Sequence, residues 1–361
     1  MADLSLNQPA PAVAPHIPGA GSVSRTMFIV QACLVPATLY GFWLYGWPAI
    51  HLFFLTVASC VFWEVFCIRL AGRNSTPFVK DGSAILTGWL LAMTLPPWAP
   101  WWVAVMGGLL AIVFGKHVFG GLGQNLFNPA MVARVALLVS FPVPLTQWVM
   151  PVPITSAGAP GFIEGLQILF SSAGIPDAVS SASLLGHVKT EMSRGIDLLH
   201  SLGGDHENLL SYVGSRPGSL GETAAWLIVG GGLAMLGLGV ISWHIPVAFL
   251  AGLAIPAAIG HATDPARYLD VSTQLLSGGA MLGAFFIATD YVTSPSTNKG
   301  KLIFGAGCGF LIFVIRTWGG YPEGVAFAVL LMNTLTPVID RFTKPRILGR
   351  DKRGRPLQLK D

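Results

Sequence analysis

Long apolar runs separated by short polar or glycine- and proline-rich stretches occupy most of the 361-residue chain. A run of about 20 apolar residues can cross a bilayer as a helix, and a shorter run can do so where the helix is broken or enclosed by protein. We therefore expect an all-α polytopic membrane protein with ten spans. They are predicted at about 27–46, 49–70, 82–97, 100–118, 126–142, 222–241, 244–262, 274–292, 302–318 and 322–341.

Composition agrees with this fold class. Hydrophobic residues make up 53% of the chain and charged residues 11%, which is typical of a membrane protein and not of two soluble domains. The formal net charge of +4 gives no reason to expect nucleic-acid binding. The sequence has no HExxH or GxSxG motif of a hydrolytic enzyme. Its four cysteines lie in apolar runs without a CxxC pair, which indicates packing thiols; they are Cys33, Cys60, Cys67 and Cys308.

The predicted spans divide the chain into five parts. Residues 1–26 are rich in Ala and Pro, lack the apolar core of a signal peptide, and are expected to be a disordered cytoplasmic tail. Residues 27–142 and 222–341 hold five spans each. The polar residues 143–221 form a loop between them, and 342–361 form a basic cytoplasmic tail.

Lysine and arginine positions predict the orientation, because cytoplasmic loops are enriched in both. With ten spans the two termini share one side, and that side receives fifteen of the 21 basic residues. These are Arg25, Arg69, Arg73, Lys80, Lys116, Lys299, Lys301, Arg341, Lys344, Arg346, Arg350, Lys352, Arg353, Arg355 and Lys360. The opposite side receives only Lys189, Arg194, Arg216 and Arg267. We therefore expect both termini in the cytoplasm of a bacterium, the central loop in the periplasm, and the chain in the inner membrane.

The two groups of spans resemble each other in sequence. Residues 82–94 (GSAILTGWLLAMT) align without gaps on 278–290 (GGAMLGAFFIATD), and KHVFGG from Lys116 is similar to IRTWGG from Ile315. Because each group has an odd number of spans, the second copy must cross the membrane upside down. This pattern predicts two inverted five-helix repeats, an arrangement typical of transporter-like folds with sites near the axis between the repeats.

Polar side chains gather at the cytoplasmic ends of the third and eighth spans, which are short, glycine-rich and bounded by prolines. Segments of this kind are expected to be discontinuous helices that line a cavity. The side chains either belong to a functional site or cap helix ends. They are Lys80, Asp81, Asp290, Ser294, Thr297, Asn298 and Lys299.

Arg134 lies near the middle of the fifth predicted span. An unpaired guanidinium at that depth costs several kcal/mol, so it must face the bundle, a cavity or an anionic ligand. Glu64 in the second span is a possible partner by residue type alone. A structural salt bridge and a functional role both stay open.

The polar interval between the two groups is far longer than loops in compact proteins usually are. It contains an apolar run at 162–170 and the stretch DAVSSAS at 177–183. By composition alone, the hydroxyl cluster in DAVSSAS is equally consistent with a solvated turn.

Three blocks give the chain a resemblance to a known family. They are DGSAILTGWLLAMTLPPWAPWW from Asp81, FGKHVFGGLGQNLFNPAM from Phe114 and GAFFIATDYVTSPSTNKGK from Gly283. In this order they resemble the family of RnfD proteins of the Rnf electron-transport complex and, more distantly, the NqrB proteins of the sodium-pumping NADH:quinone reductase. The blocks fall in both groups of spans, whereas the tails and most of the polar interval match only loosely.

The resemblance implies a covalently bound flavin. Members of the family carry FMN joined through its phosphate to a Thr hydroxyl in a motif D-G-x-[ST]-G-A-T, installed by a separate flavin transferase. DAVSSAS follows this order with Asp177, Ser180, Ala182 and Ser183, and departs from it with Ala178, Ser181 and the serine at position 183 itself. Since Ser offers the same nucleophilic oxygen as Thr, we expect FMN on Ser183, with Ser181 as the alternative.

Other residues of the interval are expected to serve the same flavin. Asp177 is expected to act in the transferase reaction and not in electron transfer. The hydrophobic side chains of Phe162, Leu166 and Phe170 are expected to pack against the isoalloxazine ring, because they lie close by in the sequence.

By resemblance, the complex passes electrons between ferredoxin and NAD and couples this transfer to movement of Na⁺ or H⁺ across the membrane. The chain has no iron-sulfur or nicotinamide motif, so it is not catalytic alone. The implied partners are the A, B, C, E and G proteins of the Rnf complex and the flavin transferase. A second, non-covalent flavin such as riboflavin is expected at the cytoplasmic ends of the third and eighth spans.

Two other interpretations stay open. The chain could be the NqrB-like component of the quinone reductase itself, although that component usually has a longer N-terminal region than the roughly 25 residues found here. A stand-alone channel or transporter for a small solute would suit the inverted repeats and broken helices equally well. Such a channel would have no need of DAVSSAS.

Overall fold

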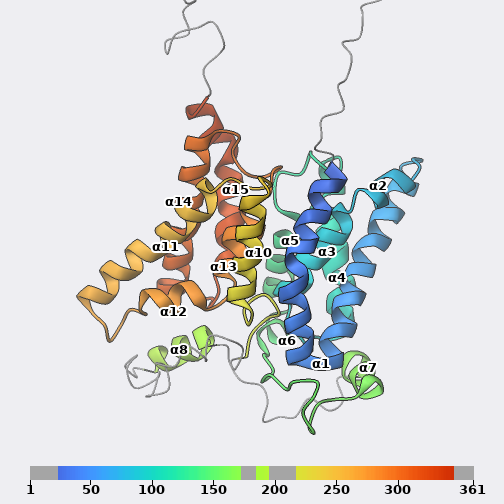
Figure 1. Ribbon diagram of the computed structural model, residues 1–361, viewed down its shortest axis with the longest axis horizontal. Helices are drawn as coiled ribbons and strands as arrows, with labels where there is room; N and C mark the ends of the chain where they lie inside the picture. The colour runs from blue at the N-terminus through green and yellow to red at the C-terminus, as the bar shows by residue number, and fades with distance from the viewer. Residues whose placement is uncertain (1–22, 172–183, 195–216, 345–361) are drawn as a thin grey trace, which may run out of the picture.

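The computed structural model describes residues 23–171, 184–194 and 217–344, and the regular elements in these ranges are helices (Figure 1). The first group comprises α1 (Val23–Leu70), α2 (Thr76–Lys80), α3 (Ser83–Thr94), α4 (Trp101–Leu109), η1 (Leu110–Phe114), η2 (His117–Phe119) and α5 (Pro129–Ser140). The central interval holds α6 (Pro142–Thr146), α7 (Phe162–Ser171) and α8 (Leu184–Ser193). The second group comprises α10 (Ala225–Gly237), α11 (His244–Thr263), α12 (Val271–Leu276), α13 (Ala280–Leu282), η5 (Gly283–Ile287), α14 (Asn298–Trp318) and α15 (Val325–Phe342).

Within these described ranges, five helices are long and apolar enough to cross a membrane: α1, the continuous helical segment Trp101–Phe119, α11, α14 and α15. Shorter apolar helices, among them α3, α5 and α10, lie between them. The all-α polytopic fold class is therefore confirmed at this level. The count of ten spans and the inverted repeat stay predictions.

A sharp bend divides α1 into two arms. Gly46 has φ 68° and ψ −159°, a left-handed conformation that glycine adopts without steric cost, and Pro48 follows two residues later. Figure 1 shows the two arms side by side in blue. The first two predicted spans, 27–46 and 49–70, coincide with these arms.

The eighth predicted span is broken, as its glycine-rich sequence indicates. Helix α12 ends at Leu276, α13 starts at Ala280, and η5 is a turn of π-helix. Between them Gly278 has φ 64°, while Gly82, its partner in the sequence alignment, has φ 78° directly before α3. Both aligned glycines thus provide a left-handed residue just before a short helix.

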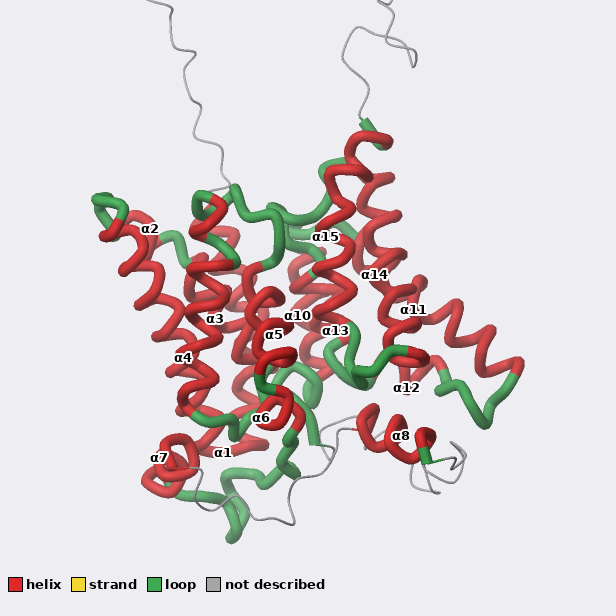
Figure 2. The backbone as a smooth tube through the Cα atoms, turned by 180° about the vertical axis from the view of Figure 1, so that it is seen from behind, coloured by secondary structure: helices red, strands yellow, loops and turns green. Residues whose placement is uncertain are grey.

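The two groups meet along the middle of the molecule, where α5 contacts α15 and α10 contacts α1. The start of α1 and the end of α15 lie at one end of the bundle, which we call the terminal end (Figure 1). Helices α6, α7, α8 and α12 lie at the opposite end, which we call the interval end (Figure 2). The described helices of the central interval and the helix ends leading to the termini are therefore on opposite sides, whereas the orientation in a membrane stays a prediction.

Small residues let the helix backbones approach closely, as is typical of helix packing in membranes. A Cβ atom at Gly305 of α14 would lie 2.7 Å from the carbonyl oxygen of Ile245 in α11. On α10, a Cβ at Gly231 would collide with the carbonyl oxygen of Cys33 in α1. A Cβ at the neighbouring Gly230 would meet no atom within 4 Å.

This pair of glycines gives a matched test of the contact between α10 and α1. We expect Gly231→Ala to destabilise the protein by about 1–3 kcal/mol, because the backbones must move apart. Gly230→Ala should be neutral or stabilising by up to about 1 kcal/mol, since alanine favours the helix. Thermal unfolding of both variants in detergent measures the difference. Equal unfolding temperatures would show that α10 does not pack on α1 in this way.

Candidate functional site

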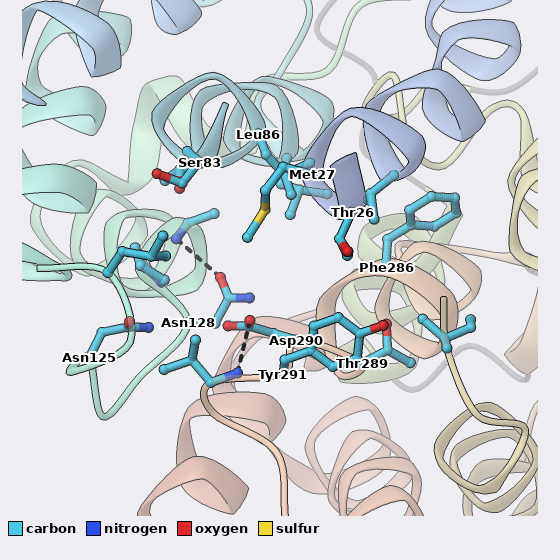
Figure 3. A pocket seen from close by; sticks show the side chains of 18 of the residues that line it. Thr26, Met27, Ser83, Leu86, Asn125, Asn128, Phe286, Thr289, Asp290 and Tyr291 are labelled. Carbon is cyan, nitrogen blue, oxygen red and sulfur yellow. Dashed lines mark hydrogen bonds between the residues drawn. The ribbon is translucent and has the colours of Figure 1, made fainter. Parts of the chain in front are cut away.

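A cavity of about 90 Å³, lined by both apolar and polar side chains, lies between the two helix groups at the terminal end (Figure 3). Residues of α1, α3, α10 and η5 line it, together with the loops before α5 and after η5. Its polar lining residues are Thr26, Ser83, Thr87, Lys116, Asn125, Asn128, Thr289, Asp290 and Tyr291. Since one water molecule needs about 10–15 Å³ of such volume, the cavity has room for several waters or a hydrated ion.

The cavity brings the predicted polar ends of the third and eighth spans together. Ser83 starts α3, and Asp290 follows η5, so the two side chains enter from different groups (Figure 3). The Asp290 carboxylate accepts hydrogen bonds from Val292 N at 3.3 Å and Thr293 Oγ1 at 3.2 Å. In the described ranges no cation pairs with this carboxyl group, which lines the cavity.

Asn128 joins the two groups at the floor of the cavity. Its side-chain oxygen accepts from Ala130 N at 3.1 Å and Met131 N at 3.3 Å, and so caps the start of α5. Its side-chain nitrogen donates to Ile287 O at the end of η5, at 3.4 Å. One amide therefore fixes the first group to the second.

A buried ion pair lies beside the cavity. Lys116 Nζ is 2.8 Å from Glu64 Oε1 and donates to Ser83 Oγ at 2.8 Å, and the Lys116 and Glu64 side chains are 2% and 1% exposed. His117 Nε2 lies 3.1 Å from the other carboxylate oxygen. The sequence suggested Glu64 as a partner for Arg134, and this was wrong, because Lys116 after η1 pairs with Glu64.

The Lys116–Glu64 pair holds α1 and α3 against the end of η1. We expect Lys116→Met to destabilise the protein by about 3–5 kcal/mol, because it leaves a buried carboxylate without its main cation. The double variant Glu64→Gln with Lys116→Met should recover part of this loss, since no buried charge is left. Denaturation in detergent compares the wild type, Lys116→Met, Glu64→Gln and the double variant. A double variant as unstable as the sum of its two single variants would contradict the pairing.

The second group has a similar buried cation at the interval end. Arg316 near the end of α14 donates from Nη2 to Ser277 O at 3.0 Å, just before α13, and to Glu323 Oε1 at 3.0 Å. Glu323 Oε2 accepts from Gly279 N at 3.0 Å. Lys116 and Arg316 lie in the aligned segments KHVFGG and IRTWGG. Lys116 bonds to the first residue of the short helix α3, and Arg316 bonds to the turn just before the short helix α13.

Arg134 faces a smaller cavity of about 30 Å³ at the interval end, lined also by Ser219, Glu222 and Glu323. The sequence prediction that Arg134 must face the bundle, a cavity or a ligand is confirmed. Met131 and Ile287 line this cavity, whereas their neighbours Asn128 and Phe286 line the larger one. The two cavities are therefore separated by a thin apolar layer between the groups.

Other predicted polar residues have local roles. The Asp81 side chain accepts from Ser83 N at 2.7 Å, and Thr297 caps the start of α14. Lys80 and Lys299 are exposed. Of the seven residues named from the ends of the third and eighth spans, Asp290 lines the cavity.

The predicted flavin site lies outside the described residues. Asp177, Ser180, Ser181, Ala182 and Ser183 precede α8, whose first residue is Leu184. The expected ring-packing residues of α7 have other contacts. Phe162 lies edge-on to Trp47 at 5.0 Å between ring centroids, and Phe170 stacks on Trp101 at 6.0 Å. These rings therefore pack α7 against the first group.

Helix α8 is attached to the second group by Lys189. Its Nζ donates to the carbonyl oxygens of Ile315 and Arg316, both at 3.3 Å, and of Tyr321 at 3.0 Å. Leu185 and Val188 on the same helix are buried. Lysine at the carbonyl end of a helix is favourable for both hydrogen bonding and the helix dipole. The sequence identified Lys189 only as a basic residue of the periplasmic loop.

We expect Lys189→Met to loosen α8. Hydrogen bonds from a charged donor contribute about 1.5–3 kcal/mol, so backbone amides of α8 should exchange about 10- to 100-fold faster. Hydrogen exchange read by mass spectrometry measures this change. Lys299→Met, at an exposed lysine, is the control and should leave α8 unchanged. Unaltered exchange in Lys189→Met would refute the attachment.

Fold and cavities define a multi-pass helical membrane protein with buried charges between two helix groups. Comparison with known proteins then places it: the chain belongs to the NQR2, RnfD, RnfE family, whose model matches residues 11–349.

The relatives named here are D components of ion-translocating oxidoreductase complexes. The chain is 51% identical over 336 residues to the protein of that name from Stutzerimonas stutzeri, covering 93% of this chain and 95% of the relative. Its counterpart from Halorhodospira halophila is 49% identical over 343 residues, covering 95% and 96%. That of Escherichia fergusonii is 41% identical over 353 residues, covering 94% and 98%. The resemblance inferred from the three sequence blocks is therefore confirmed.

Proposed function

We propose that this chain is the flavin-carrying membrane component of an Rnf-type complex that couples electron transfer between ferredoxin and NAD to the movement of Na⁺ or H⁺. The observation that carries the proposal is the full-length similarity, at 49–51% identity, to proteins named as the D component of an ion-translocating oxidoreductase complex. The multi-pass helical bundle with polar cavities between its two groups is compatible with such a role. The A, B, C, E and G proteins of the complex and a flavin transferase are the proposed partners, in a bacterial inner membrane.

FMN is proposed to be attached to Ser183 through a phosphoester, with Asp177, Ser180, Ser181 and Ala182 forming the surrounding motif. When bound, FMN supplies one- and two-electron transfer, while the protein supplies position and electrostatics. The carrier segment leads directly into α8, which Lys189 and two buried apolar residues hold against the second group. A cavity of about 230 Å³ beside α8 is lined by Trp148, Lys189 and Thr190, among others. These residues would hold the ring of an attached flavin close to the bundle, while packing of the ring against Phe162, Leu166 and Phe170 stays a prediction.

The attachment has a direct test. The chain, co-produced with a flavin transferase, is denatured and run on a gel, and flavin fluorescence is read under ultraviolet light. We expect a fluorescent band that Ser183→Ala abolishes, because no other link survives denaturation. Ser181→Ala is the matched control and should keep the band. A dark band from the wild-type protein would refute the proposal, and loss of fluorescence in Ser181→Ala alone would move the site to Ser181.

A second, non-covalent flavin such as riboflavin is proposed at the terminal end, beside the cavity that Ser83, Asn128 and Asp290 line. The polar residues of this cavity are also proposed to serve the translocated ion.

The proposal differs from the two other interpretations in what it requires. A stand-alone solute channel needs neither a flavin nor partner proteins, so covalent FMN would exclude it. A role in the quinone reductase shares the flavin but would require the purified complex to reduce quinone. The three relatives carry the name of the ion-translocating oxidoreductase complex, which favours the Rnf-type complex.

A further inference from the structure

Arg134 is a buried cation whose hydrogen bonds are missing. Arg134 is 8% exposed, and its Nη1 atom has no hydrogen-bond partner. Throughout the described ranges, no hydrogen bond or ion pair within bonding distance involves its guanidinium. Leaving a buried charged donor unsatisfied costs more than the roughly 1–3 kcal/mol of a neutral group. Something in the adjoining cavity must therefore accept hydrogen bonds from Arg134.

The cavity has the size and lining for bound water. Its volume of about 30 Å³ has room for roughly two water molecules. Two carboxylates from the other helix group, Glu222 and Glu323, also line it, and both act on Arg134 electrostatically. Neither lies within salt-bridge distance of the guanidinium. Water that accepts from Arg134 and donates to a carboxylate would satisfy both sides.

Glu222 and Glu323 differ in which protonation states their hydrogen-bond partners allow. Glu323 accepts one hydrogen bond on each oxygen, from the Arg316 guanidinium and from Gly279 N. Both donors therefore require both oxygens of Glu323 to act as acceptors. Glu222 accepts from the Ser219 hydroxyl at 2.9 Å. A hydroxyl can also rotate and accept a hydrogen bond. The surroundings of Glu222 therefore suit both the carboxylate and the carboxylic acid, whereas those of Glu323 suit only the carboxylate.

We propose that Arg134, Glu222 and bound water form a proton-exchange site at the interval end, in which Glu222 takes a proton from a hydronium ion in the cavity and later returns it to water. In the forward step a hydronium ion gives its proton to the Glu222 carboxylate, leaving a carboxylic acid and a neutral water. Arg134 is the fixed positive charge that favours release of the proton. The site rests on the proposed function and deepens it, because it provides an ion-translocating protein with a place where H⁺, and not Na⁺, is bound.

The charges around the site favour a proton over a metal cation. With every group ionised, Glu222 and Glu323 are balanced by Arg134 and Arg316, so the set is neutral. A sodium ion would have to sit beside the guanidinium of Arg134, which has no direct ion pair in the described part of the chain, whereas a proton forms a covalent bond with a Glu222 oxygen. Tyr45 of α1, which accepts from Gly218 N at 3.1 Å, is the remaining titratable neighbour.

Infrared spectroscopy of the purified full-length chain tests the site directly, because a protonated carboxyl has a carbonyl band distinct from that of a carboxylate. We expect such a band to appear and disappear reversibly between about pH 5 and about pH 9, the range in which buried carboxyl groups titrate. All variants carry Asp290→Asn, because Asp290 is a second carboxyl group without a cation partner in the described ranges. In that background Glu222→Gln should abolish the band, and Glu222→Asp should restore a band at a shifted frequency. Glu323→Gln is the matched control and should keep it.

Arg134 variants separate the exchange site from a merely structural role. Arg134→Met should shift the midpoint of the band to higher pH, because the cation that favours the carboxylate is gone, whereas Arg134→Lys should stay close to the wild-type midpoint. A titrating band that survives Glu222→Gln, or no such band, would overturn the proposal. Loss of the band on adding Na⁺ at fixed pH would likewise overturn it, by making the site one for a metal cation. The experiment needs no flavin, so its failure leaves the assignment of Ser183 untouched.

Discussion

Compensation of charge inside an apolar bundle is the constraint on which the rest of this structure depends. A charged side chain between membrane helices must find an opposite charge, a backbone carbonyl or water. Lys116 satisfies this requirement through Glu64 and Ser83 at the terminal end, and Arg316 through Glu323 and Ser277 O at the interval end. Both cations fix the start of a short helix that cannot cross a membrane by itself. The broken helices, and the cavities beside them, are therefore held by ionic contacts.

The same constraint explains the division of the interior into two cavities. Asp290 and the hydroxyl groups around it line the cavity at the terminal end, while Arg134 and Glu222 line the cavity at the interval end. Met131 and Ile287 are 1% exposed and stand between the cavities. An apolar layer of this kind blocks free passage of an ion between the two cavities.

Sequence patterns predicted the helical membrane fold, the break near Gly278 and the burial of Arg134, because each depends on local composition and on the cost of charge in an apolar environment. They could not give the partners of buried charges. Glu64 was matched to Arg134 by type, whereas the fold places it beside Lys116. Asn128 was overlooked, although an asparagine before a proline is a common helix start, and its link to Ile287 O depends on two segments distant in sequence. The role of Lys189 in attaching α8 could not be predicted either, because its acceptors are carbonyl groups at the end of α14 and in the loop that follows.

The central claim is that this chain carries a flavin by a covalent bond to Ser183 within the interval that leads into α8. Intact-mass spectrometry of the chain purified from native membranes tests it most directly, together with fragmentation that locates any added group. The account predicts a mass increased by one phosphoester-linked FMN, with the modified fragment containing Ser183. An unmodified polypeptide mass from native membranes would contradict it.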